Sequence, residues 1–99
     1  MTTSAAETAT PLATGVAVTD DTLTVDLSDG RTIAVPLAWY PRLLHATSAE
    51  RANWRLVLRG EGVHWPGVDE DISVASLVAG RPSSESAASL QRWLATRKA

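Results

Sequence analysis

The sequence predicts one α+β domain, in which a three-stranded antiparallel meander, a short broken helical connection, a second β-hairpin, a short helix and a C-terminal helix follow in order. Two observations predict this class. Apolar and polar residues alternate over residues 16–35 and 54–65, which is the period of strands with one buried face. Elsewhere, cap residues, proline and glycine enclose short segments whose apolar residues recur at helical spacing.

The first two strands are predicted by a register that keeps their apolar side chains on one face. A two-residue loop at residues 20–21 sets Val18 opposite Leu23. The preceding apolar residue of the first strand, Val16, then lies opposite Val25. The sequence therefore predicts a strand, a tight turn and a second strand.

The second turn is expected to contain the three residues 28–30. A two-residue turn would place Asp26 beside Ile33 and put a carboxylate on the apolar face. With Gly30 in the left-handed conformation, a three-residue turn pairs Val25 with Ile33 instead. A hairpin with a bulge at Gly30 is therefore predicted.

A broken helical connection is expected to follow the third strand. Pro41 suits the first position of a helix that runs to Ala46. Thr47 and Glu50 have the spacing of a capping box, which opens a second helical piece through Asn53.

Alternation returns at Trp54 and predicts a second hairpin with its turn at residues 60–61. In this register Leu58 lies against Val63. Leu56 lies against Trp65, so these apolar side chains are expected in the core. The opposite face of the same strand is expected to carry Arg55, Val57 and Arg59.

Two helices are expected after an acidic loop at residues 69–71. Ser73 is a suitable N-cap and Gly80 a suitable left-handed C-terminal residue, so a short helix lies between them. Serines at positions 83 and 84 can cap a final helix, whose apolar stripe is Ala87, Leu90, Trp93 and Leu94. The expected organisation is a disordered N-terminal tail (1–14), a core domain (15–80) and a C-terminal helix packed on the core or on a partner (81–99).

Composition excludes several functional classes. Apolar residues make up 44% of the chain, but no run approaches the ~20 residues of a membrane-spanning helix. The absence of cysteine excludes disulfides, thiolate catalysis and sulfur-ligated zinc. The net charge of −2 has the wrong sign for a domain that neutralises many phosphates. The N-terminus lacks the pattern of a secretion signal, so a cytoplasmic location is expected.

The segment from His64 to Asp71 contains the densest set of chemically active side chains. Its histidine and its carboxylates could hold a metal or share a proton. A simpler interpretation is that Asp69 and Asp71 accept hydrogen bonds from backbone N–H groups at the turn and the helix start. Neither this histidine nor His45 belongs to a recognisable nucleophile motif. We therefore expect no catalytic residue, no metal and no cofactor, with a metal-dependent hydrolase using His64, Asp69 and Asp71 as an alternative.

Three segments resemble a family of small bacterial proteins known as domain of unknown function 2442. They are SDGR (28–31), VPLAWYPRL (35–43) and GEGVHWPGVDEDISVASLVAG (60–80), and the resemblance covers about residues 14–80. It implies the α+β order derived above and little about activity. Members resemble stand-alone proteins or modules attached to a helix-turn-helix, and some are suspected to act in toxin–antitoxin-like pairs. The residues after Gly80 suffice for one helix, so an appended helix-turn-helix is not expected.

Six side chains are candidates for binding a partner. Trp39 and Tyr40 stand at a strand-to-helix junction, where they either plug the domain or form a binding patch. Trp93 belongs to an apolar stripe that needs a surface, either on its own domain or on another chain. The arginines form either an anion-binding stripe or an ordinary solvated face. The candidates are Trp39, Tyr40, Arg42, Arg55, Arg59 and Trp93.

The expected function is a non-enzymatic protein-interaction module that binds another small protein or a second copy of itself. The motivating observation is large aromatic side chains without a catalytic motif. An alternative is a transcription-associated or antitoxin-like regulator that contacts nucleic acid through the arginines. No membrane partner is expected.

Overall fold

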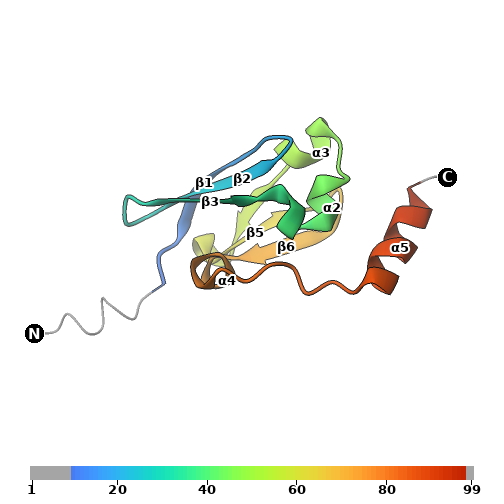
Figure 1. Ribbon diagram of the computed structural model, residues 1–99. Coiled ribbons are helices and arrows are strands. Elements are labelled where there is room, and N and C mark those ends of the chain that lie inside the picture. The colour runs from blue at the N-terminus through green and yellow to red at the C-terminus, as the bar shows by residue number, and fades with distance from the viewer. Residues whose placement is uncertain (1–9, 98–99) are drawn as a thin grey trace, which may run out of the picture.

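The computed structural model describes residues 10–97 and contains two three-stranded antiparallel sheets, stacked one above the other in Figure 1. The first sheet consists of β1 (Ala13–Val18), β2 (Thr22–Leu27) and β3 (Thr32–Pro36). The second sheet consists of β4 (Arg55–Val57), β5 (Gly62–Trp65) and β6 (Glu70–Ser73). The predicted α+β class and the order of elements are confirmed, and β6 adds a third strand to the expected second hairpin.

Short helices join and follow the sheets. They are the 3-10 turns η1 (Leu37–Trp39) and η2 (Leu58–Gly60) and the α-helices α2 (Pro41–Leu44), α3 (Ser48–Ala52), α4 (Val74–Ala79) and α5 (Ala87–Thr96). In Figure 1, α5 stands at one end of the molecule, after an extended segment that leaves α4. Within residues 10–97, no helix is long and apolar enough to cross a membrane.

The first sheet has the predicted registers. Val18 pairs with Leu23 in the first hairpin, and Val25 pairs with Ile33 in the second. Gly30 has a φ of 93°, which is the left-handed conformation expected for the bulge. A shift of register near the start of β1, next to Gly15, was not predicted. Part of the segment expected as a tail, residues 1–14, belongs to β1, and residues 1–9 lie outside the described part of the chain.

The helical connection is broken, as predicted. Pro41 occupies the first position of α2, which ends at Leu44, two residues before the expected end. Thr47 and Glu50 form the predicted capping box, with the Glu50 N–H donating to Thr47 Oγ1 at 3.1 Å and the Thr47 N–H donating to Glu50 Oε1 at 2.8 Å. The turn η1 before α2 was not predicted.

The predicted register of the second hairpin is wrong. Leu56 pairs with Val63 rather than with Trp65. Leu58 does not belong to the strand at all, because β4 ends at Val57 and the chain enters η2. As a result Leu56 is 39% exposed and Leu58 is 73% exposed, although both were expected in the core.

The cause of this register is the packing of the turn against β1. Leu58, Arg59 and Gly60 all have positive φ, at 52°, 60° and 97°. Gly60 is buried, and a Cβ built on it would lie 2.8 Å from the carbonyl oxygen of Ala13. The turn can approach β1 this closely only with glycine at position 60, and it begins at Leu58, before the predicted two-residue turn.

The core is drawn from both sheets and from the helices between them. Its largest fully buried side chain, Trp65, donates its indole N–H to the Arg51 carbonyl oxygen at 3.1 Å, which satisfies its polar group. Trp54 is half-buried against the same core. The buried residues are Ala13, Leu23, Val25, Leu27, Val35, Leu37, Tyr40, Leu43, Val63, Trp65, Val68, Ile72, Val74 and Leu77.

The predicted caps are correct for α4 and wrong for α5. For α4, the predicted N-cap at Ser73 and the left-handed Gly80, with a φ of 72°, are both confirmed. For α5, the predicted caps at residues 83 and 84 are wrong, because Ser86 caps the helix. The N–H of Ser83 donates to the Trp39 carbonyl oxygen at 3.0 Å, so the chain is still an extended strap at that position.

Substitution of the two turn glycines, Gly30 and Gly60, tests whether the contact of Gly60 with β1 matters for stability. Replacing Gly30 with alanine should cost about 1–2 kcal/mol in the free energy of unfolding, because its Cβ meets no other atom and only backbone strain is added. Replacing Gly60 with alanine should cost an additional ~1–3 kcal/mol, since it adds a collision with Ala13. Urea denaturation of both variants measures the difference, and equal costs would contradict the proposed role of Gly60.

Candidate functional site

Arg42 connects the strand-to-helix junction with the C-terminal strap. Its Nη2 donates to Glu85 Oε2 at 2.8 Å, and its Nη1 donates to the Val68 carbonyl oxygen at 3.1 Å. Its guanidinium carbon also lies 5.1 Å from the centre of the Trp93 ring, within cation–π range. The ion pair holds the pKa of the Glu85 carboxyl below its usual range. Two regions proposed separately from the sequence therefore contact one another.

Trp93 is held on its own domain by a second arginine. The guanidinium carbon of Arg97 lies 4.6 Å from the centre of the ring, and its Nη2 pairs with Glu50 Oε1 at 2.7 Å. Arg97 donates two hydrogen bonds to the Glu50 carboxylate. These bonds, together with the one from the Thr47 N–H, lower the pKa of Glu50 to about 2. No residue of α5 is fully buried. Polar and cation–π contacts hold this helix on the domain, together with the half-buried Trp93, which packs against the core.

The junction residues are mostly internal. Tyr40 is 3% exposed, and its hydroxyl donates to the Arg81 carbonyl oxygen at 3.4 Å. Burial, followed by the nearby charge of Glu70, raises the pKa of this hydroxyl. Trp39 is half-buried and packs against the core. Of the two interpretations of the junction, the plug fits Tyr40, and little of the junction is free for a partner.

The arginine stripe, one of the two interpretations of this strand face, does not form. Arg55 lies on β4 and is exposed, whereas Arg59 lies in η2, beyond the end of the strand. The left-handed backbone at Arg59 breaks the alternation on which the stripe was based. Arg42, the third arginine among the candidates, pairs with Glu85 of the C-terminal strap.

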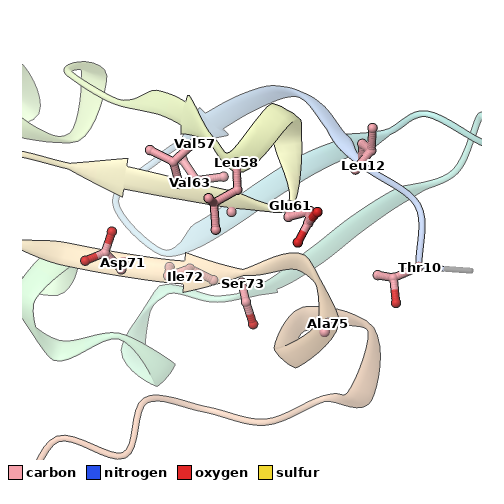
Figure 2. A pocket seen from close by; sticks show the side chains of 11 residues that line it. Thr10, Leu12, Val57, Leu58, Glu61, Val63, Asp71, Ile72, Ser73 and Ala75 are labelled. Carbon is pink, nitrogen blue, oxygen red and sulfur yellow. The ribbon is translucent and has the colours of Figure 1, made fainter.

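An apolar groove of about 520 Å³ lies beside η2 (Figure 2). Figure 2 shows Leu58 between the N-terminal segment, which contributes Leu12, and strand β6, with Ala75 of α4 beyond. Sequence reasoning missed this groove because it assigned Leu56 and Leu58 to the core. The residues that line it are Thr10, Leu12, Val57, Leu58, Glu61, Gly62, Val63, Asp71, Ile72, Ser73 and Ala75.

The charged side chains around the groove have one sign. Glu61 and Asp71 supply carboxylates, and among residues 10–97 no lysine or arginine lines the groove. A ligand with apolar groups beside a positive charge therefore fits it better than an anionic ligand.

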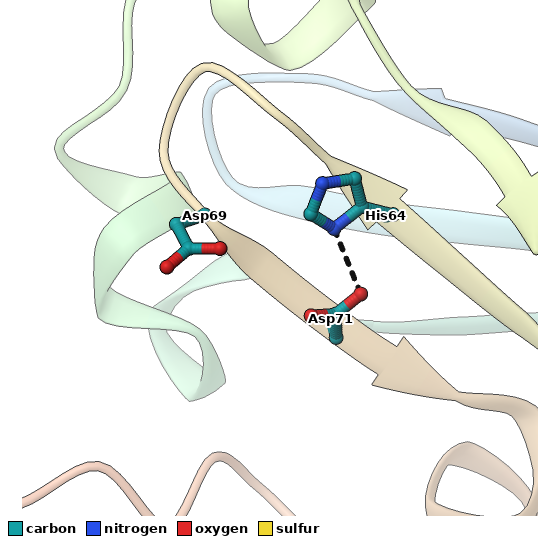
Figure 3. A group of neighbouring side chains, drawn as sticks. All are labelled: His64, Asp69 and Asp71. Atoms are coloured by element: carbon teal, nitrogen blue, oxygen red, sulfur yellow. Dashed lines mark hydrogen bonds and ion pairs between the residues drawn. The ribbon is translucent and has the colours of Figure 1, made fainter.

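His64, Asp69 and Asp71 meet at the edge of this groove (Figure 3). His64 on β5 and Asp71 on β6 are direct cross-strand partners, so their side chains lie on the same face. His64 Nδ1 lies 2.8 Å from Asp71 Oδ1. One ligand atom from each of the three residues lies within 4.8 Å of the others. The structure thus brings together the three residues of the metal-dependent alternative.

The expected structural role of the two aspartates is wrong. They were expected to accept from backbone N–H groups at the turn and the helix start. In the described part of the chain, no backbone N–H donates to either carboxylate; Asp71 contacts His64 instead, and Ser73 alone caps α4. The physical reason is that residues 70 and 71 form strand β6, which directs the Asp71 side chain across to β5.

Glu70 is an ionisable residue that sequence reasoning did not single out. Burial and the neighbouring charge of Glu85 raise its pKa to about 7, although Arg42 acts in the opposite direction. It lines a small cavity of about 190 Å³ beside Tyr40, under the strap of residues 81–84. A carboxyl with this pKa can exchange a proton at neutral pH. Its burial follows from β6, which the sequence did not predict, so no sequence signal identified it.

Comparison with known proteins identifies relatives without an assigned activity. A family model described as protein of unknown function (DUF2442) matches residues 13–83. A crystal structure of a protein of unknown function from Rhodospirillum rubrum is similar at 27% identity and a TM-score of 0.65, covering 76% of this chain and 93% of that one. A solution structure of an uncharacterised protein from Chromobacterium violaceum shares the fold at 19% identity and a TM-score of 0.64, covering 87% and 75%. No curated protein matches the chain.

Acid should weaken the attachment of α5 through Glu50. Because the pKa of Glu50 falls from its ordinary 4.5 to about 2 in the folded protein, the unfolded chain binds more protons between these values. The stability from the pair with Arg97 is therefore present above pH 4.5 and is lost as the pH falls towards 2. Glutamine preserves the capping box, so Glu50→Gln removes mainly the charge.

Urea denaturation from pH 2 to 5 measures this effect. The stability difference between the unmodified protein and Glu50→Gln should be largest above pH 4.5 and should shrink towards pH 2. Glu61→Gln serves as the control, because Glu61 is exposed and lies away from Arg97 in the second hairpin. A difference that does not change with pH would contradict the assigned ion pair.

Proposed function

Because the chain belongs to the DUF2442 family of proteins of unknown function, we propose from its geometry that it is a non-enzymatic protein-interaction module. The observation that carries the proposal is the apolar groove beside η2, with Leu58 73% exposed on its wall. A solvent-exposed leucine beside further apolar side chains is a typical anchor position for a partner.

The backbone at Leu58 supports the proposal. A bulky residue with positive φ is a conformational outlier that costs about 1–2 kcal/mol. Such strain persists where surrounding structure imposes it, and it is concentrated at binding sites. Here Leu58 begins the turn that packs the buried Gly60 against β1, and its side chain is exposed to solvent instead of buried in the core.

The form of the groove favours a polypeptide over a small molecule. Small-molecule pockets bury most of the surface of their ligand. The Leu58 side chain, which forms one wall of the groove, is itself mostly exposed. Only a partner that extends beyond the groove can cover it. The partner we propose is a polypeptide segment in which an apolar side chain stands beside arginine or lysine, because Glu61 and Asp71 supply only negative charge.

The surfaces that the sequence suggested, the strand-to-helix junction and the C-terminal helix, fit this role less well. Tyr40 is buried, and both Arg42 and Trp93 are engaged within the chain. Partner binding through them would require α5 to leave its present position. The groove requires no such rearrangement, so it is the preferred binding surface.

A matched pair of leucine variants tests the groove. Leu58→Asn removes the apolar anchor at a position where asparagine tolerates positive φ, so folding should not suffer. Leu44→Asn is the control, since Leu44 is 39% exposed on α2 and does not line the groove. The probes are two fluorescent dodecapeptides, one pairing leucine with arginine and one pairing leucine with glutamate.

Fluorescence anisotropy should detect binding of the leucine–arginine peptide only. Burial of a leucine side chain contributes about 1.5–3 kcal/mol, so Leu58→Asn should weaken binding about 10- to 100-fold. Leu44→Asn should leave it unchanged. Equal affinities of both variants, equal binding of the two peptides, or no binding of either would count against the proposed partner.

A further inference from the structure

The strongest unassigned chemistry in the molecule is at the edge of the groove. Cross-strand pairing of β5 with β6 places His64 and Asp71 side by side, and Asp69 precedes β6 at a turn with a φ of 52°. Figure 3 shows the His64 ring and the Asp71 carboxylate facing each other, with Asp69 at the turn before β6. His64 is 19% exposed and Asp71 is 69% exposed, so solvent reaches the cluster.

We propose that His64, Asp69 and Asp71 form a binding site for one divalent transition-metal ion, with Zn²⁺ as the best-fitting member of the class. The three residues supply one imidazole nitrogen and two carboxylate oxygens, which are ordinary zinc ligands. This inference goes beyond the proposed function, and the two sites share Asp71.

The distances are compatible with such a site after small movements. Donor atoms around a tetrahedral ion with bonds of about 2.0–2.1 Å lie roughly 3.4 Å apart. The three ligand atoms already lie within 4.8 Å of one another. His64 Nδ1 and Asp71 Oδ1 are 2.8 Å apart. Asp69 is exposed and lies outside the strands, so its side chain can close the remaining gap.

The nature of the donors selects among metals. Mg²⁺ and Ca²⁺ prefer ligand sets made of oxygen alone, whereas imidazole suits zinc and other transition metals. Three protein ligands leave one tetrahedral position open for water or for a donor from a bound molecule. Asp71 belongs to both the cluster and the lining of the groove, so that open position would stand at the edge of the groove.

Electrostatics supports a cation at this position. Two carboxylates within 4.8 Å of each other repel when both are charged, and a bound cation converts that repulsion into attraction. Arg42 donates to the main-chain carbonyl of Asp69, and its charge is paired with Glu85. Arg55 is the cross-strand partner of His64 and so lies on the same face of the sheet. Among residues 10–97, neither Arg55 nor any other arginine forms an ion pair with Asp69 or Asp71.

Isothermal titration of the untagged full chain with ZnCl₂ tests the site. We expect one Zn²⁺ per chain and a melting temperature that rises with Zn²⁺ concentration. His64→Gln and Asp71→Asn should each weaken binding at least about tenfold. His45→Gln is the matched control, because the chain has only two histidines and His45 lies outside the cluster.

Asp69→Asn serves as a third variant if either strand substitution disturbs folding, since it changes an exposed residue before β6. It too should weaken Zn²⁺ binding, and MgCl₂ should give no comparable binding to the unmodified chain. The proposal is overturned if the unmodified chain takes up no Zn²⁺, if the cluster variants bind it as tightly as the unmodified chain, or if only His45→Gln abolishes binding.

Discussion

The close approach of Gly60 to the start of β1 is the constraint on which the rest of the second sheet depends. No side chain fits between the glycine and the Ala13 carbonyl oxygen, so the chain passes through three consecutive left-handed residues at the turn. This geometry ends β4 early, sets the register of β5 and directs Leu58 to solvent. The apolar groove is thus a consequence of how the two sheets are joined, and it does not reflect a poorly filled core.

Strand β6 distributes the ionisable side chains of the domain. Neighbouring residues of a strand project to opposite faces, so the half-buried Glu70 lies beside Tyr40 beneath the C-terminal strap, whereas the exposed Asp71 pairs with His64. The same strand therefore carries a carboxyl whose pKa is raised to about 7 and a group of potential metal ligands. These environments differ although the residues are adjacent in the sequence.

Features with local causes could be predicted from the sequence, and features with distant causes could not. The turn at Gly30, the capping box at Thr47 and the cap at Ser73 depend on neighbouring residues, and all three are confirmed. The register of the second hairpin depends on contact between Gly60 and a residue far away in the chain. Once that register and β6 were missed, neither the groove nor the pairing of His64 with Asp71 could be placed.

The attachment of α5 belongs to the same group of distant effects. From the sequence, the apolar stripe around Trp93 could pack on its own domain or on another chain. The structure places Arg42 of the domain and Arg97, at the end of the helix, over the indole. Since both surfaces suggested by the sequence are engaged there, we propose that a partner binds at the groove beside Leu58 instead.

The most direct test is an amide NMR titration of the full chain with the leucine–arginine peptide. The account predicts that shifts concentrate at residues 57–63 and 71–75, while the indole N–H signal of Trp93 stays in place. Shifts centred on Trp39, Arg42 and Trp93, with the groove unchanged, would contradict it and return binding to the C-terminal helix.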